Sequence, residues 1–276
     1  MKISINSWAL NPMLSISERM KQVKNVGVNF LELNFEENIP NLVLGWDTTK
    51  FQLNKLLQIS EENNISFSSI CTELFWNYSL ASNNKTEKSI AIKLGKKMIQ
   101  VASYLKASSI VVIPCKNLSD INATNPFNTI YTNSIESILE LSDFAQEYKI
   151  IIGIENVFFN DFLNNPIEFK NFIDEINRDN VKVHFDIGNA NLTNYPIAEW
   201  LEILDKHIYA IHIKDTLKEV KTLKTFKPLL DGDIEWQPVM EKLKSMNYNN
   251  YLILEHSFSN GNFEISELIK RLNKIL

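Results

Sequence analysis

The sequence predicts an α/β protein with a closed (β/α)8 TIM-barrel fold. Short apolar, β-branched segments alternate with longer amphipathic segments along the chain, which indicates parallel strands joined by helices. Eight such units within 276 residues fit a closed barrel, which commonly needs about 250 residues. The chain has no GxGxxG or Walker-type loop, so the usual nucleotide-binding reason for an open sheet is missing.

The eight expected strands cover residues 2–8, 29–35, 65–72, 109–114, 150–156, 181–186, 208–214 and 251–255. The expected helices cover residues 17–25, 51–63, 86–105, 133–148, 167–178, 197–205, 237–246 and 264–275. Ser15 with Glu18 fits a capping box, and Asn165 before Pro166 fits an N-cap with a first-turn proline. Because no linker or low-complexity tract interrupts the pattern, residues 1–276 are expected to form a single domain.

Composition and charge narrow the class of protein. The net charge of −5 gives no global basic field for nucleic acid. No uncharged run approaches the roughly 18 residues of a membrane span, and the N-terminal segment lacks the features of a signal peptide. Cys71 and Cys115 have no metal-type spacing and fit a reducing compartment. We therefore expect a cytoplasmic protein without a nucleic-acid or membrane partner; a homo-oligomer is compatible with the sequence.

Polar residues stand at the ends of the last four expected strands. They are Glu155, Asp186, His212 and Glu255. In closed barrels the active site lies at the carboxyl ends of the strands, so these side chains should meet at one rim. Three buried carboxylates repel one another, and a divalent cation would relieve that repulsion. Three oxygens and one nitrogen suit Mn²⁺ or Mg²⁺ and are compatible with Co²⁺ or Zn²⁺.

Each of these residues also has a structural interpretation. A glutamate at a strand end can cap a helix or pair with lysine, Asp186 can form a turn over Gly188, and a lone histidine is commonly a core residue. Their joint position on four successive strand ends favours the metal site. Glu32 and Glu73 lie near the ends of the second and third strands, and the sequence assigns neither of them a partner.

Five segments of the later chain carry a resemblance to a known family. They are GIEN (153–156), FDIGNAN (185–191), HIKD (212–215), LLDGDIEW (229–236) and LILEH (252–256). Their order and spacing resemble the sugar phosphate isomerase/epimerase family, the xylose isomerase-like barrels that include ketose 3-epimerases and pentulose-5-phosphate 3-epimerases. The resemblance implies one divalent metal held by the four strand-end residues. It also implies that Glu155 and Glu255 act as the catalytic acid/base pair.

Four more residues are candidates for substrate binding. Many relatives have histidine where this chain has Asn189. The segments DIGN and HIKDT look more like the pentulose-phosphate branch of the family. Asn189 either binds a substrate hydroxyl or serves as a turn residue. Alternation turns His184 into the barrel, as a substrate or metal-site contact or as interior filling. Lys214 can reach a substrate oxygen or phosphate, or remain a solvated rim lysine. Trp8 can form an apolar wall or pack in the core.

The predicted function is a metal-dependent sugar or sugar-phosphate isomerase/epimerase that inverts C3 of a ketose through a cis-enediolate. The sequence does not separate epimerisation from aldose–ketose isomerisation. A lyase similar to inosose dehydratases and a sugar-binding protein without catalysis are alternatives. A hydrolase similar to apurinic endonucleases is disfavoured, because that activity needs extra histidines where strands three and four here end in Cys-Thr-Glu and Pro-Cys.

Overall fold

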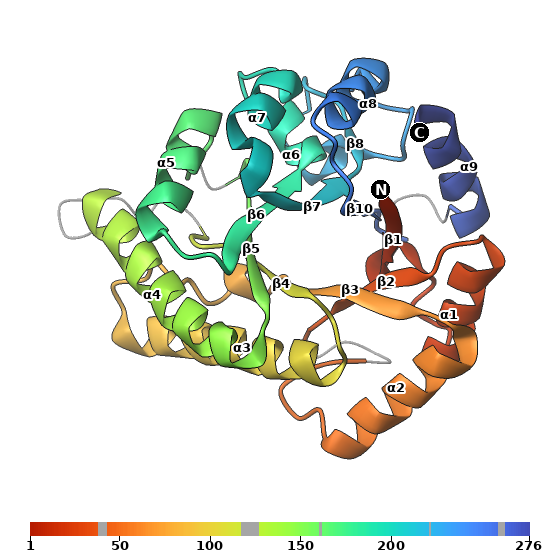
Figure 1. Cartoon of the computed structure of the whole chain (residues 1–276), viewed down its shortest axis with the longest axis horizontal. Coiled ribbons are helices and arrows are strands. Elements are labelled where there is room, and N and C mark those ends of the chain that lie inside the picture. Colours follow the sequence, from red (N-terminus) through yellow and green to blue (C-terminus); the bar gives the residue numbers. More distant parts are fainter. Residues whose placement is uncertain (38–42, 117–126, 160–161, 221, 259–262) are drawn as a thin grey trace.

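Eight parallel strands close into a barrel, as the alternation predicted (Figure 1). The computed structural model describes residues 1–37, 43–116, 127–159, 162–220, 222–258 and 263–276. Around the barrel the strands follow the order β1, β10, β7, β6, β5, β4, β3, β2. Their bounds are β1 Lys2–Asn6, β2 Phe30–Asn34, β3 Ser66–Cys71, β4 Ser109–Val112, β5 Ile151–Glu155, β6 Val181–Asp186, β7 Ile208–Ile213 and β10 Tyr251–Leu254.

Helices surround the barrel (Figure 1). They are α1 Ile16–Asn25, α2 Lys50–Asn63, α3 Lys85–Tyr104, α4 Phe127–Tyr148, α5 Pro166–Ile176, α6 Ile187–Asn191, α7 Ile197–Leu204, α8 Trp236–Ser245 and α9 Ile265–Ile275. The capping box of Ser15 and Glu18 and the Asn165 N-cap are both confirmed. Among the described helices, none has the length and apolarity that a bilayer crossing requires.

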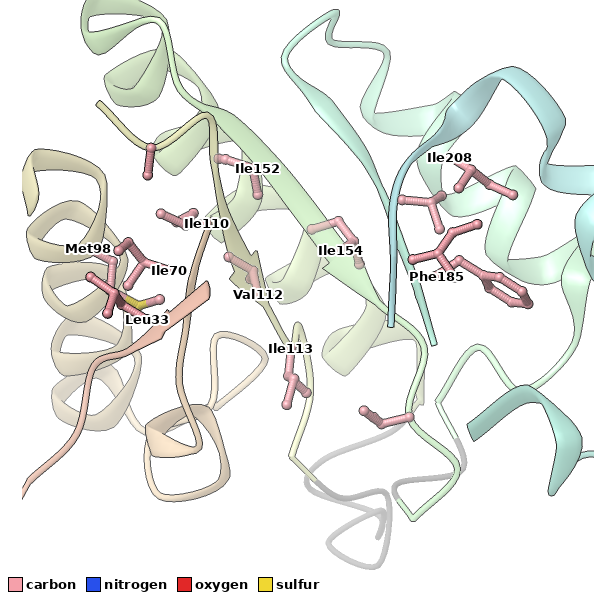
Figure 2. Packing of buried hydrophobic residues seen from close by; sticks show 14 of the residues in the cluster. Leu33, Ile70, Met98, Ile110, Val112, Ile113, Ile152, Ile154, Phe185 and Ile208 are labelled. Atoms are coloured by element: carbon pink, nitrogen blue, oxygen red, sulfur yellow. The ribbon is translucent and has the colours of Figure 1, made fainter. Parts of the chain in front are cut away.

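Alternation along each strand divides its side chains between two environments. Ile152 and Ile154 of β5 join the apolar layer between strands and helices, where Figure 2 shows them with Ile110, Val112 and Phe185. Residues of opposite parity point into the barrel, so Glu155 ends β5 on the inner face. Ala210, Tyr251 and Ile253 form a small apolar cluster inside the barrel. The interior also holds buried polar side chains, those of Ser4, Asn6, Glu32, Ser69, His184 and His212.

Most expected boundaries differ from the structure by one or two residues, and two of the differences have clear local reasons. The first strand ends at Asn6 rather than at residue 8, because the Asn6 side chain accepts a hydrogen bond from the Trp8 amide and starts a short 3-10 turn. Helix α4 begins at Phe127 rather than at residue 133. Its first turns pack Phe127 and Tyr131 against Phe162, which supplies tertiary contacts that the helical period alone does not reveal.

A two-stranded hairpin that the sequence did not predict follows β7. Strands β8 Asp215–Thr216 and β9 Phe226–Lys227 pair antiparallel. Asp215 is fully buried, and its carboxylate accepts hydrogen bonds from the amides of Thr216, Leu230 and Ile234 and from Trp236 Nε1. A buried carboxylate with four donors is well satisfied and fixes both the hairpin and the turn before α8.

We expect Gly232→Ala to loosen this hairpin. A Cβ at position 232 would lie 2.1 Å from Asp215 Oδ1 and 2.5 Å from the Thr216 carbonyl oxygen, and the backbone oxygen cannot rotate away. The substitution should lower the free energy of unfolding by about 1–3 kcal/mol, measured by denaturant titration.

Gly95→Ala is the matched control. Its Cβ would meet only the Leu141 side chain, at 2.8 Å, which can move. Alanine also gains roughly 1 kcal/mol of helix propensity over glycine. Equal destabilisation by the two substitutions would contradict the proposed rigidity of the hairpin.

Candidate metal centre

The four predicted ligands converge at the carboxyl end of the barrel. Glu155 ends β5, Asp186 ends β6, His212 lies on β7 and Glu255 follows β10, and these strands are neighbours. One potential ligand atom from each residue lies within 4.8 Å of the others. Asp186 and His212 are fully buried, and Glu155 is nearly so. The arrangement presents three carboxylate oxygens and one imidazole nitrogen to one point.

A cavity of about 430 Å³ opens above this cluster. Glu155 and Glu255 line it, together with three of the predicted substrate-binding residues: Trp8, Asn189 and Lys214. Aromatic side chains form much of the remaining wall, namely Trp76, Phe159 and Phe226. The site therefore combines a charged floor with apolar walls, as small-molecule sites commonly do.

Glu32 fixes the orientation of His212. The His212 Nε2 atom lies 2.7 Å from Glu32 Oε1, while its Nδ1 atom lies 3.2 Å from Glu155 Oε1 and 3.0 Å from Glu255 Oε2. An ionised carboxylate only accepts hydrogen bonds, so Nε2 carries the proton and donates it to Glu32. The Nδ1 atom thereby faces the oxygens of the other predicted ligands. A carboxylate behind a ligating histidine is a common way of orienting the ring.

The Glu32 carboxylate is itself held in place by hydrogen bonds from neighbouring side chains. Its side chain is fully buried, and it accepts hydrogen bonds from Asn6 Nδ2 at 2.7 Å and Ser69 Oγ at 2.5 Å. Burial alone would raise the pKa of Glu32, but the charge and hydrogen bond of His212 outweigh burial and lower it. The pKa of His212 is correspondingly raised well above its usual value: burial opposes this, and Glu32 and Glu255 outweigh burial.

His184 lies beneath His212 and does not line the cavity. Its ring meets the His212 ring edge to face, with centroids 4.1 Å apart. Burial, together with the charge of His212, lowers the pKa of His184 to about 3, so its ring is neutral at physiological pH. Among the described residues it has no hydrogen-bond partner at either ring nitrogen. The contact that His184 makes with the site runs through His212.

Asn189 and Lys214 both touch carboxylates of the predicted ligands. Asn189 Nδ2 donates to Asp186 Oδ2 at 2.8 Å and to the Asn156 carbonyl oxygen at 3.0 Å, while Asp186 Oδ1 accepts the Asn189 amide and caps α6. Lys214 Nζ lies 2.6 Å from Asp186 Oδ2, donates to Glu255 Oε2 at 2.8 Å and sits 4.6 Å from the Phe226 ring centroid. Asn189 thus combines the turn role with a place on the cavity wall.

The charges of the cluster fit a divalent cation. Four buried or nearly buried carboxylates, those of Glu32, Glu155, Asp186 and Glu255, face only two cationic side chains, Lys214 and His212. Burial raises the pKa of Glu155 to about 7 against the effect of His212, and burial raises the pKa of Asp186 against the effect of Lys214. A bound dication would offset the excess negative charge and lower the pKa of each carboxyl group.

Comparison with known proteins identifies the family of this barrel. The family model described as "Xylose isomerase-like TIM barrel" matches residues 20–275. The chain belongs to this family. The probable L-ribulose-5-phosphate 3-epimerase of Mycoplasma pneumoniae is 24% identical, over 78% of this chain and 68% of that protein. The putative L-ribulose-5-phosphate 3-epimerase of Haemophilus influenzae is 26% identical, over 92% of this chain and 88% of that protein.

A solved structure shares the fold of the present chain over nearly the whole length of the chain. The crystal structure of a D-tagatose 3-epimerase-like protein superposes with a TM-score of 0.81, covering 99% of this chain and 96% of that one at 21% identity. At this level of identity the likeness establishes the fold. The relatives are named as epimerases, which are isomerases.

Sequence reasoning left Glu32 without a role, and the structure places it against His212. Its partner lies 180 residues away, so no local spacing links the two. The sequence carried only a weak indication of this role. Glu32 is an acidic residue within the mostly apolar strand FLELN, and its position in the alternation turns its side chain into the barrel. Glu73, the other unassigned glutamate, lines the cavity, and burial with the charges of Glu36 and Glu255 raises its pKa.

We expect Glu32→Gln to weaken divalent-metal binding by about 10–100-fold, the usual cost of losing a carboxylate behind a ligating histidine. Glutamine keeps the shape but removes the charge that holds the proton on Nε2. Isothermal titration with Mn²⁺ measures the change directly, and Glu73→Gln is the control because Glu73 touches no predicted ligand. Unchanged Mn²⁺ affinity in a folded Glu32→Gln protein would exclude this positioning role.

Proposed function

We propose that this chain is a divalent-metal-dependent carbohydrate epimerase that inverts C3 of a ketose through a cis-enediolate. The observation that carries the proposal is the placement of Glu155 and Glu255. They come from strands separated by β6 and β7, both line the cavity, and both approach His212 Nδ1. Two carboxylates that reach one point from different sides suit removal of a proton from one face and its return to the other.

The chain's own residues perform the proton transfers in this proposal. Burial raises the pKa of both glutamates, but the net results are opposite: the pKa of Glu155 rises to about 7, while Lys214 and His212 outweigh burial and hold the pKa of Glu255 far below its usual value. Such a split supports one group as acid and the other as base. A divalent ion, Mn²⁺ or Mg²⁺, would polarise the carbonyl and stabilise the enediolate charge.

The relatives support a phosphorylated pentulose as the substrate. Both curated relatives are named as L-ribulose-5-phosphate 3-epimerases. Aromatic walls formed by Trp8, Trp76 and Phe159 exclude water from the reacting carbons, which protects an enediolate from unwanted protonation. The cavity of about 430 Å³ is large enough for one such sugar phosphate.

The decisive experiment incubates the Mn²⁺-loaded protein with L-ribulose 5-phosphate in D₂O. The C3 epimer should form with deuterium at C3, detected by NMR and mass spectrometry. Deuterium at C1 or C2 with an aldose product would instead identify an aldose–ketose isomerase, and loss of water would identify a dehydratase. Either result contradicts the proposed 3-epimerisation.

Glu155→Gln and Glu255→Gln should each lower kcat by at least about 100-fold, because each removes one acid/base group from the reaction. Glutamine keeps the size and one oxygen of the side chain. Metal content is measured on the same samples at saturating Mn²⁺, so that lost proton transfer is separated from lost metal. Wild-type turnover in both variants would refute the assignment of the pair.

Metal removal should abolish epimerisation and lower thermal stability. A ligand that binds only the folded state stabilises it by about 2.7 kcal/mol at 100 times its dissociation constant. Unfolding scans with EDTA and with Mn²⁺ measure the shift, and Asp186→Ala should remove most of it. Full activity in protein that contains no metal by elemental analysis would rule out the proposed mechanism.

A further inference from the structure

Lys214 places a positive charge among the predicted metal ligands. Its Nζ atom lies 2.6 Å from Asp186 Oδ2 and donates a hydrogen bond to Glu255 Oε2 at 2.8 Å. Burial alone would lower the pKa of Lys214, but the charges of Asp186 and Glu255 outweigh burial and raise it above its usual range. The buried side chain is therefore a charged ammonium, held between two of the carboxylates that would bind a dication.

The hydrogen-bonding capacity of Asp186 is largely filled. Its Oδ1 atom accepts the Asn189 amide at the start of α6. Its Oδ2 atom, on the side of Glu255, accepts Asn189 Nδ2 at 2.8 Å and binds Lys214 Nζ. A carboxylate oxygen has two lone pairs, so these two donors occupy both lone pairs of Oδ2. A metal ion that binds this oxygen must therefore replace one of them.

The second oxygen bound by Lys214 also belongs to the predicted ligand set. Glu255 Oε2 accepts the hydrogen bond from Lys214 Nζ and lies 3.0 Å from His212 Nδ1, the nitrogen that faces the other predicted ligands. The ammonium is therefore bound to oxygens of two predicted ligands, and one of these oxygens also approaches a third. A dication bound there would compete with the ammonium for the same oxygens, and the two cations would repel each other.

Of the two donors at Asp186 Oδ2, Lys214 is the one that can move. Asn189 belongs to α6, and its Nδ2 atom also donates to the Asn156 carbonyl oxygen at 3.0 Å. Lys214 instead reaches the carboxylates through a flexible four-carbon chain. Rotation within that chain moves the ammonium without any change in the backbone.

Open space lies beside the ammonium. Lys214 lines the cavity above the cluster and also an adjoining cavity of about 410 Å³, whose wall includes Lys227 and Ser257. The Phe226 ring, 4.6 Å from Lys214 Nζ, lines both cavities and offers the ammonium an aromatic face. A displaced Lys214 side chain can therefore enter a cavity without disturbing the packed interior.

We propose that Lys214 is an internal counter-cation that a divalent metal displaces from Asp186 and Glu255. This inference rests on the proposed metal-dependent function and adds how the site exchanges one cation for the other. Before metal loading, the ammonium gives two buried carboxylates the cation that they need. After loading, the same ammonium is free in the cavity. Lys214 thus stabilises the unloaded barrel and lowers its affinity for the metal.

Metal affinity tests the exchange. Lys214→Met removes the charge and keeps most of the side-chain length, so Mn²⁺ should bind at least about 10-fold more tightly in isothermal titration. The same substitution should lower the midpoint of denaturant unfolding in EDTA, because two buried carboxylates lose their cation. The matched control is Lys224→Met, because Lys224 is exposed and lines neither cavity. This control should leave the Mn²⁺ affinity and the unfolding midpoint unchanged.

Chemical labelling follows Lys214 in the wild-type protein and does not depend on the folding of a variant. Reductive methylation with formaldehyde and a borane reductant, read by peptide mass spectrometry, modifies accessible amines. Lys214 should react at least about 10-fold faster with Mn²⁺ than with EDTA, because the ion pairs with Asp186 and Glu255 keep it charged and shielded. Lys96, which pairs with Glu140, should react equally in both conditions.

Neither measurement uses a sugar, so failure of the exchange is distinguishable from failure of the epimerase function. Tighter Mn²⁺ binding by Lys214→Met, with labelling that depends on Mn²⁺, supports the exchange even if no ketose is epimerised. Equal or weaker Mn²⁺ binding by Lys214→Met, or labelling of Lys214 that Mn²⁺ does not change, would overturn it. Absence of Mn²⁺ binding in both wild type and Lys214→Met would overturn the exchange together with the metal-dependent mechanism.

Discussion

Burial of four carboxylates at one end of the barrel is the constraint on which the rest of the site depends. Glu32, Glu155, Asp186 and Glu255 lie within reach of one histidine, in a region where charges are weakly screened. Such a cluster persists only where every oxygen meets a donor or a cation. The polar interior layer of Asn6 and Ser69 supplies donors from below, and the capping amide of α6 supplies one from the side.

The stability that offsets this cluster comes from outside the barrel. Strand residues of the opposite parity form one continuous apolar layer with the surrounding helices (Figure 2). Because alternation separates the two faces strictly, a charged inner residue and an apolar outer residue follow each other along the same strand, as Ile154 and Glu155 do. A strand can therefore carry closely spaced charges on its inner face without weakening the apolar packing of its outer face.

The sequence predicted the elements whose residues follow a repeating pattern. It did not predict the short local elements or the contacts between residues far apart in the chain. Period-two strands and period-3.6 helices predicted the barrel, and the position of polar residues at the ends of successive strands predicted that Asp186 and His212 lie close together. The hairpin β8–β9 has two residues per strand, too few for any period, and α6 is a single short helix set by the Asp186 cap. The contact of Glu32 with His212 depends on the depth of both residues in the barrel, which only closure of the sheet defines.

The site has two parts that can change separately: the residues inside the barrel and the residues of the cavity walls at its mouth. The residues that hold His212 lie on strands inside the barrel, where any change in size or charge disturbs several neighbours at once. The cavity walls come instead from connecting segments: Trp8 from the turn after β1, Phe226 and Lys227 from the hairpin, and Ser257 from the segment after β10. Substitutions there alter the shape and charge of the cavity while leaving the carboxylate cluster intact. A barrel can thus keep its interior while its cavity walls change, and this chain shares its fold with a D-tagatose 3-epimerase-like protein, at a TM-score of 0.81, although only 21% of the residues are identical.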